Sequence, residues 1–217
     1  MTNLSLRLNY LSNICSKYHG NFYDLCCDHG KLGMSLGGYK NIDEIYLVDI
    51  VPSIINSLKN KATYIPNGKF NIKLEDCTKI KFNTKKEKII TIAGVGGHLT
   101  IGILENALPQ VTNNDTIILS PHNNLQKVRT YLSQTNLGLV EELLIRDNKK
   151  FYEIFVLNNC SKRKIEAVGN FEQTNKLIRY EYYKKNYEYF KIKLKYENSQ
   201  KYRDLVNRLE KKIKDYG

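Results

Sequence analysis

The loop Asp24–Gly33 carries the first side chains that could bind a ligand. It reads DLCCDHGKLG, and Gly30 allows a tight turn and a close approach of the backbone to that ligand. It lacks the GxGxxG pattern with which backbone amides surround the pyrophosphate of a nicotinamide dinucleotide. Asp28 instead presents a carboxylate to an ammonium group, which favours S-adenosylmethionine over NAD. The alternative is that Asp28 only caps the helix that follows.

Further acidic residues follow at positions that suit a nucleoside. Asp49 lies nineteen residues after Gly30, and an acid at this distance can accept hydrogen bonds from both ribose hydroxyls. Glu75 and Asp76 follow a later apolar run, where a carboxylate could accept from an adenine amino group. A solvated turn is the alternative there. These acids favour a cofactor that contains a nucleoside.

Two later segments could bring a substrate to that cofactor. Residues 93–98 read AGVGGH, and three glycines within four residues let the backbone run close to a ligand. His98 is either a base or only a residue at the start of the next helix. Residues 120–124 read SPHNN, a polar loop that could hold a substrate base.

Short apolar runs alternate with helical patterns and predict the sheet that positions these loops. We expect strands at residues 22–26, 44–48, 70–74, 88–93 and 116–119, and helices at 4–18, 31–39, 52–62, 98–111 and 125–134. Residues 139–145 and 151–157 are expected to form a hairpin. Five β–α units followed by a hairpin predict an α/β fold with a mostly parallel sheet. A seven-stranded sheet in the order 3-2-1-4-5-7-6 is the architecture of the Rossmann-like class I methyltransferases. The candidate loops would then share the carboxyl edge of the sheet, where such folds bind ligands.

Composition limits the class of protein. The chain has 217 residues, of which 41% are hydrophobic, enough for one sizeable core. No apolar run approaches the ~18 residues that a membrane span needs, and residues 1–16 do not resemble a signal peptide. The five cysteines and four histidines are scattered without a CxxC pair. We therefore expect a cytoplasmic protein with reduced thiols, no metal site and no membrane association. Nothing in the composition indicates an oligomeric state.

The positive charge is concentrated in the C-terminal quarter of the chain. Residues 160–217 carry 16 Lys/Arg and 8 Asp/Glu, whereas residues 1–159 carry 18 and 14. A genome rich in A/T codons would explain part of the lysine excess but not this asymmetry. We expect two domains, at 1–159 and 160–217, of which the second suits a polyanion.

The basic segment contains two apolar seams at helical spacing. Positions 183, 187, 190 and 194 form one seam, and positions 202, 205, 209 and 213 form the other. The polar residues 197–200 separate them, which predicts a helical hairpin; one long helix is the alternative. The aromatic side chains are expected to form an ordinary core seam, with stacking of exposed tyrosines on unpaired bases as the alternative.

Taken together, five motifs resemble one family. The segments LSLRL (4–8), CDHG (27–30), VDIVP (48–52), AGVGG (93–97) and FYEI (151–154) look like those of the bacterial tRNA (adenine-22-N1)-methyltransferases. The resemblance covers about residues 4–158, and the tail resembles that family's coiled-coil-like C-terminal domain. One motif departs: the family commonly has Gln-Pro-Asn where this chain has Ser120, Pro121 and His122. Substrate contacts at that loop are therefore expected to differ.

The resemblance implies transfer of a methyl group from S-adenosylmethionine to N1 of an adenine in tRNA. N1 has a lone pair, so the reaction needs in-line positioning and no covalent nucleophile. A paired or stacked adenine must first be flipped out. A nearby carboxylate would stabilise the positive charge of the product, with Asp28 the first catalytic candidate and His29, His98 and His122 behind it. The expected cofactor residues are Asp24, Cys27, Asp28, Gly30, Asp49, Ile50, Asp76, Ala93 and Gly94, and the expected substrate residues are Arg7, Gly96, Gly97, Pro121, Lys184 and Lys185.

Two other functions stay open from the sequence. A methyltransferase that acts on a protein or a small molecule would keep the same cofactor residues and make the basic tail incidental. A non-catalytic RNA-binding module would keep the fold and the tail without binding the cofactor.

Overall fold

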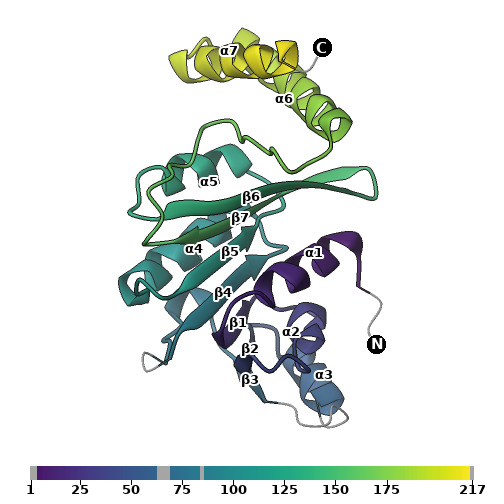
Figure 1. Cartoon of the computed structure of the whole chain (residues 1–217), viewed down its shortest axis with the longest axis vertical. Coiled ribbons are helices and arrows are strands. Elements are labelled where there is room, and N and C mark those ends of the chain that lie inside the picture. The colour runs from purple at the N-terminus through teal and green to yellow at the C-terminus, as the bar shows by residue number, and fades with distance from the viewer. Residues whose placement is uncertain (1–3, 63–68, 84–85, 216–217) are drawn as a thin grey trace.

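A twisted sheet of seven strands forms the centre of the computed structural model, which describes residues 4–62, 69–83 and 86–215 (Figure 1). The strand order is β3-β2-β1-β4-β5-β7-β6. β7 runs antiparallel to both β5 and β6, and the other pairs are parallel. The predicted fold class and strand order are therefore confirmed. The strands are β1 (Gly20–Leu25), β2 (Ile42–Asp49), β3 (Phe70–Leu74), β4 (Lys88–Ala93), β5 (Thr116–Ser120), β6 (Gly138–Asp147) and β7 (Lys150–Asn158).

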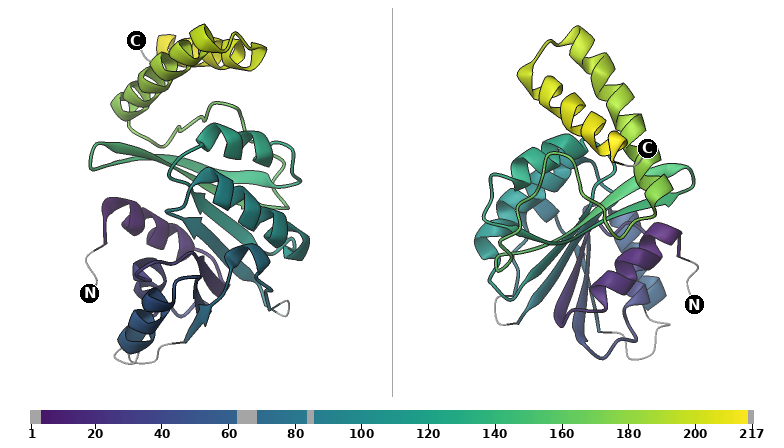
Figure 2. Two further views of the ribbon diagram at one scale, coloured as in Figure 1. Left: turned by 180° about the vertical axis from the view of Figure 1, so that it is seen from behind. Right: turned by 45° about the horizontal axis from the view of Figure 1, so that its top comes forward.

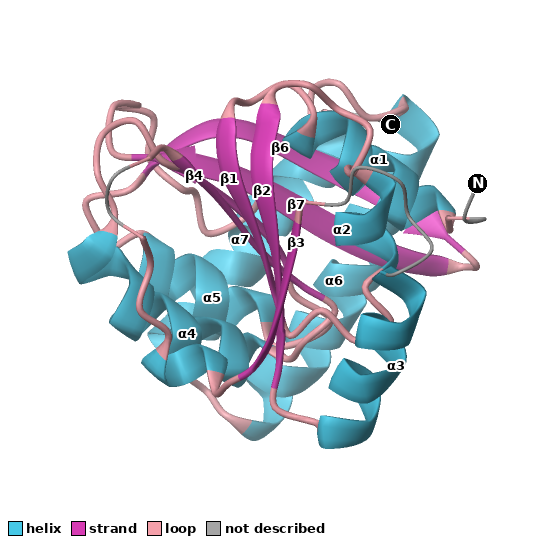
Figure 3. Ribbon diagram, turned by 90° about the horizontal axis from the view of Figure 1, so that it is seen from below, coloured by secondary structure: helices cyan, strands magenta, loops and turns pink. Residues whose placement is uncertain are grey.

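Helices cover both faces of this sheet (Figure 3). On one face lie α1 (Leu6–Cys15), α2 (Lys31–Ser35) and α3 (Pro52–Ala62); on the other lie α4 (Gly97–Ala107) and α5 (Leu125–Leu132). Successive side chains of a strand point to opposite faces, so Phe22 packs in the α1–α3 core and Tyr23 in the α4–α5 core. Among the described residues, no helix is both long and apolar enough to cross a bilayer.

Three helices end about one turn before the residue that the sequence predicts, and α5 ends two residues early, at Leu132 rather than at residue 134. Ser5 caps α1 by accepting a hydrogen bond from the Leu8 amide, and the helix ends at Cys15 rather than at residue 18. α2 ends at Ser35, just before two consecutive glycines, residues that weaken a helix. α4 ends at Ala107 and passes into a 3₁₀ turn, Leu108–Gln110, that contains a proline. The expected limits at residues 39 and 111 are therefore wrong by one turn each.

The C-terminal tail is a helical hairpin, as predicted (Figures 1 and 2). α6 spans Lys176–Tyr196 and α7 spans Gln200–Lys214. The Ser199 hydroxyl starts α7 by accepting from the Tyr202 amide. The predicted seam residues pack together, with Tyr183, Leu205 and Leu209 buried. The alternative of one long helix is wrong.

The hairpin packs against the edge of the sheet rather than only on itself. Its core cluster includes Leu144 of β6 together with Val168 and Phe171 from the connecting segment. Ile165, in the same segment, belongs to the core of the sheet. The boundary at residue 159 stays a prediction, and these contacts make residues 160–175 the link between the two parts.

A buried ionic cluster joins the hairpin to the sheet. The guanidinium of Arg129, on α5, contacts the carboxylates of Glu142 on β6 and Glu153 on β7. The Tyr182 hydroxyl of α6 donates to Glu153, and Arg129 also donates to the Glu166 carbonyl at 2.9 Å. Burial alone would lower the pKa of Arg129, but the two carboxylates raise it above its ordinary value. Four elements and the linking segment therefore depend on one charged side chain.

We expect Arg129→Met to lower the free energy of unfolding by about 3–5 kcal/mol, because it leaves two buried carboxylates without a cation. Arg146→Met is the matched control, since Arg146 pairs with Glu181 at the exposed surface and such a pair contributes about 0–1 kcal/mol. Urea denaturation measures both. Equal losses would contradict the role assigned to the Arg129 cluster.

Candidate functional site

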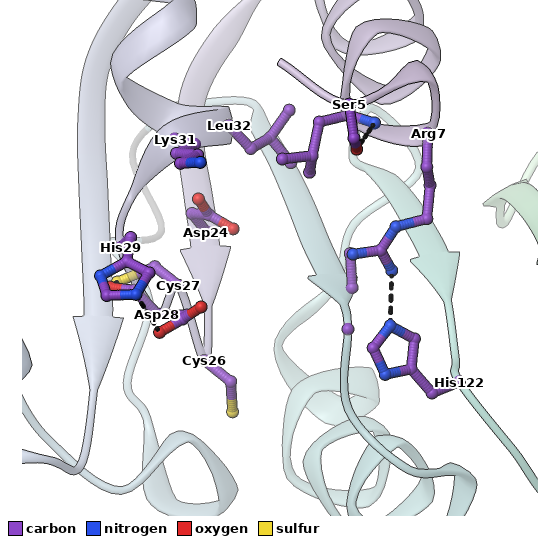
Figure 4. A pocket seen from close by; sticks show the side chains of 13 residues that line it. Ser5, Arg7, Asp24, Cys26, Cys27, Asp28, His29, Lys31, Leu32 and His122 are labelled. Carbon is purple, nitrogen blue, oxygen red and sulfur yellow. Dashed lines mark hydrogen bonds and ion pairs between the residues drawn. The ribbon is translucent and has the colours of Figure 1, made fainter. Parts of the chain in front are cut away.

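A cavity of about 340 Å³ opens at the carboxyl edge of the sheet, between the ends of β1 and β4 (Figure 4). Its walls come from the start of α1, the loop after β1, the first turn of α2 and the loops after β4 and β5. Switch-point positions of this kind bind ligands in open α/β sheets. The lining residues are Ser5, Arg7, Leu8, Asp24, Cys26, Cys27, Asp28, His29, Lys31, Leu32, Ala93, Gly94 and His122.

A buried carboxylate lies on one wall of the cavity. Asp24 is only 4% exposed, and its Oδ2 accepts a hydrogen bond from the Gly33 amide at 3.1 Å. Burial raises the pKa of Asp24 to about 7; the Gly33 amide opposes this, and the nearby Asp49 and Asp28 add to it. A carboxylate held in this way gains most from a cationic ligand, because the ligand would restore its charged form.

A guanidinium lies on the opposite wall (Figure 4). The Arg7 amide donates to Asp147 at 3.1 Å, which fixes the start of α1 against the β6–β7 turn. The Arg7 guanidinium lies 3.0 Å from Nε2 of His122 and 4.9 Å from the ring centre of Tyr152. Burial, followed by the charges of Arg7 and Lys150, lowers the pKa of His122. The neutral ring therefore accepts from Arg7, which assigns its proton to Nδ1.

Asp49 stands at the end of β2 and organises the loop after β1. It is buried; its Oδ2 accepts from the Asp28 amide at 3.1 Å and its Oδ1 from the Val51 amide at 3.0 Å. Each carboxylate oxygen can accept a second bond. The Asp28 side chain is 69% exposed and lies 3.8 Å from His29. Gly30 is the N-cap of α2, without a side-chain bond, so the alternative that Asp28 caps this helix is wrong.

The three glycines after β4, at positions 94, 96 and 97, have different structural roles. Gly94 has a φ of +85°, and a Cβ there would lie 3.6 Å from Nη2 of Arg7 on the cavity wall. A Cβ on Gly97 would lie 2.8 Å from the Asn123 carbonyl, and one on Gly96 would lie 3.0 Å from the Asn123 side chain. Gly94 thus keeps the cavity open, while Gly96 and Gly97 allow the loops after β4 and β5 to pack closely.

Several residues predicted from the sequence lie outside the cavity lining. His98, in the first turn of α4, is exposed, and its Nε2 lies 3.2 Å from Lys127. Asp76 caps a 3₁₀ turn, and hydrogen bonds from Thr78 lower its pKa. Lys184 and Lys185 are exposed on α6. Also outside the lining are Gly30, Asp49, Ile50, Gly96, Gly97 and Pro121.

The structure also adds residues that sequence reasoning missed. Ser5, Leu8, Lys31 and Leu32 line the cavity, and Tyr152 supports Arg7 from β7. The motifs at residues 4–8 and 151–154 were the available signal for Ser5 and Tyr152. The described residues contain no group of three or more His, Cys, Asp or Glu side chains that could hold a metal ion.

Comparison with protein families agrees with this geometry. Residues 4–155 match a family model described as a methyltransferase domain. A curated relative, the tRNA (adenine(22)-N(1))-methyltransferase of Bacillus subtilis, is 34% identical over 67 residues, which are 31% of this chain and 28% of that protein. The match therefore spans less than a third of that relative's length. It confirms the resemblance that the motifs indicate.

Solved structures share the whole fold. A Streptococcus pneumoniae protein in complex with S-adenosyl-L-methionine has a TM-score of 0.79, 24% identity and coverage of 97% of this chain and 100% of its own. M. capricolum TrmK, in complex with S-adenosyl-homocysteine, has a TM-score of 0.76, 21% identity and coverage of 98% and 97%. The likeness extends over the tail as well as the sheet.

We expect Asp24→Asn to stabilise the chain at pH 8 but not at pH 4. Well below the ordinary pKa of 3.8 the carboxyl group is protonated in both the folded and the unfolded chain, and at pH 4 ionisation of the unfolded chain has removed little stability. As pH rises, the unfolded chain ionises first, so the wild type loses stability until the folded pKa near 7 is passed. A shift of about three pKa units corresponds to a difference on the order of 4 kcal/mol.

Denaturation of both chains from pH 4 to pH 8 measures this difference. Asp28→Asn is the control, because it removes an exposed carboxylate from the same loop. A stability difference between Asp24→Asn and the wild type that does not change with pH would contradict the assignment.

Proposed function

Because residues 4–155 match its model, this chain belongs to the methyltransferase domain family, and we propose that it transfers a methyl group from S-adenosylmethionine to N1 of an adenine in tRNA, at position 22. The observation that carries the proposal is the pair of opposite charges, Asp24 and Arg7, on facing walls of the cavity. The name of the Bacillus subtilis relative supports the choice of nucleotide.

The residues present fit this cofactor. Its amino-acid end carries an ammonium and a carboxylate, which match the buried Asp24 carboxylate and the Arg7 guanidinium. Gly94 has no Cβ to obstruct the cavity. Asp49, at the end of β2, has oxygen lone pairs left for ribose hydroxyls. The exposed side chain of Ile50, next to it, offers an apolar surface to the adenine. NAD has no ammonium group that would use Asp24.

The chemistry divides between the cofactor and the chain. Bound S-adenosylmethionine supplies a methyl group on a sulfonium, which N1 of adenine attacks with its lone pair while the carbon–sulfur bond breaks. The chain holds the reacting groups in line, which can contribute roughly 7–11 kcal/mol. The Asp28 carboxylate, at the cavity rim, stabilises the positive charge that the adenine gains. His122 is neutral and positions Arg7. His98 does not line the cavity and contacts Lys127 instead, so we assign it no catalytic role.

The tail supplies affinity for RNA. It carries 16 Lys/Arg against 8 Asp/Glu, and contacts with phosphates dominate nucleic-acid affinity. Exposed apolar side chains, among them Tyr189 and Tyr196, lie on α6 outside the buried seam. The hairpin can therefore stack these exposed rings on unpaired bases.

The test of the proposal is a methylation assay with purified chain, labelled S-adenosylmethionine and tRNA transcripts. We expect label in an adenine at position 22, mapped as N1-methyladenosine, and none in a transcript with guanine there. Label at another adenine would correct the position. A parallel assay offers a cell extract as the substrate. Label found only in its protein or small-molecule fractions would replace tRNA as the substrate. No label in either assay, together with no binding of the cofactor, would favour an RNA-binding module.

We expect Asp49→Ala to weaken S-adenosylmethionine binding at least tenfold, because hydrogen bonds to a charged acceptor contribute about 1.5–3 kcal/mol. Asp43→Ala, at the other end of β2, is the control. Calorimetry measures both affinities, and a thermal melt checks the fold. Unchanged affinity would remove Asp49 from the cofactor site.

We expect glutamine at Lys184, Lys185, Lys191 and Lys195 to reduce tRNA affinity and flatten its salt dependence, with the helix kept because the two residues have similar helix propensity. The matched control places glutamine at four exposed lysines remote from the tail, Lys40, Lys59, Lys61 and Lys86. Anisotropy titrations at several salt concentrations measure both. Equal losses of tRNA affinity in the two variants would show that the tail lysines contribute no more to binding than lysines elsewhere on the surface.

A further inference from the structure

A second cavity of about 360 Å³ lies beside the first and belongs to both parts of the chain. The loop after β5 and the start of β7 form one side, and α6 of the tail closes the other. Its size falls in the range of small-ligand pockets. The cavity forms only when the hairpin docks on the sheet. The docking therefore creates a binding site in addition to its contribution to stability.

The two cavities share His122, which lines both. His122 is held between them by Arg7, 3.0 Å away, and by the ring of Tyr152, whose centre lies 5.7 Å from its own. Tyr152 also lines the second cavity. Ligands in the two cavities would thus be neighbours, separated by one layer of side chains.

The lining of the second cavity favours an anion. Lys150 comes from β7 and Lys185 from α6, and both are exposed. Burial, followed by the charges of Arg7 and Lys150, lowers the pKa of His122, so this ring adds no positive charge and the two lysines carry the charge of the cavity. None of the described residues that line the cavity carries a carboxylate. Two lysines from different elements converging on one hollow suit a phosphate group.

The same lining offers surfaces for a base. Phe151 and Tyr152 are consecutive on β7 and both partly exposed, and they line the cavity from opposite faces of the strand. The ammonium of Lys185 lies 5.6 Å from the Phe151 ring centre, which places the cation and the aromatic surface together. Aromatic side chains beside lysines are the usual means of binding unpaired nucleotides without reading their sequence.

Resting on the function proposed above, we propose that this second cavity binds a nucleotide that neighbours the methylated adenine in the RNA chain. Its phosphate lies between Lys150 and Lys185, and its base packs against Phe151, the ring beside Lys185. Flipping an adenine towards the cofactor in the first cavity displaces the adjoining nucleotide as well, and the second cavity holds it. The hairpin therefore contributes directly to the substrate site in addition to its general charge.

The test compares two double variants of equal charge by anisotropy titration with a tRNA transcript and a ten-nucleotide single-stranded RNA. Lys150→Gln with Lys185→Gln changes the cavity. Lys149→Gln with Lys176→Gln changes exposed lysines on the same two parts of the chain that do not line it. We expect the cavity variant to lose at least tenfold more affinity for both RNAs than the control variant, with S-adenosylmethionine affinity unchanged in both.

A second variant tests the space rather than the charge. Asn186→Phe puts a ring into the cavity from α6 and leaves every lysine in place. We expect a loss of RNA affinity of at least tenfold, with an unchanged melting temperature. Equal affinity losses in the two double variants, or wild-type RNA affinity in a folded Asn186→Phe chain, would overturn the proposal.

The outcomes separate this proposal from the proposed function. If the wild type binds RNA through the cavity lysines but methylates no tRNA, the methylation proposal fails and the nucleotide site stands. If the wild type methylates tRNA and the cavity variants bind RNA like the control variant, the function stands and the nucleotide site fails.

Discussion

The buried contact of Arg129 with Glu142 and Glu153 is the interaction on which the arrangement of this protein depends. It joins α5 to the two antiparallel strands at the edge of the sheet, and through Tyr182 it joins those strands to α6. A charge removed from water is costly unless it is fully paired. The cluster therefore favours the docking of the hairpin in which every member has a partner.

That fixed docking has consequences at the carboxyl edge of the sheet. β7 places Tyr152 under the Arg7 guanidinium, and the β6–β7 turn supplies Asp147 to the start of α1. Arg7 can face Asp24 across the cavity only because these later strands hold it there. The cavity proposed for the cofactor is thus assembled from α1 and the end of β1, together with residues that β6 and β7 hold in place.

The same edge separates two kinds of electrostatic environment. Around Asp24, burial and neighbouring carboxylates favour a cationic group, whereas the hollow between β7 and α6 gathers lysines. A sulfonium cofactor with an ammonium end and a polyanionic RNA would each meet the charge that suits it. His122, between the two cavities, is kept neutral by burial and by Arg7, so it adds no charge to either cavity.

The sequence alone determined the fold class, the strand order and the hairpin, and it predicted the loops at the carboxyl edge of the sheet, because each rests on local patterns. Short apolar runs, the glycines at 30 and 94 and the heptad seams can all be recognised within a few residues. Only the tertiary structure decided which side chains meet across the chain. Arg129 has the pattern of an ordinary helix residue, and nothing near it in sequence shows that it is buried between two carboxylates. Likewise, Asp24 rather than the exposed Asp28 became the buried acid of the cavity, since desolvation depends on residues packed from distant elements.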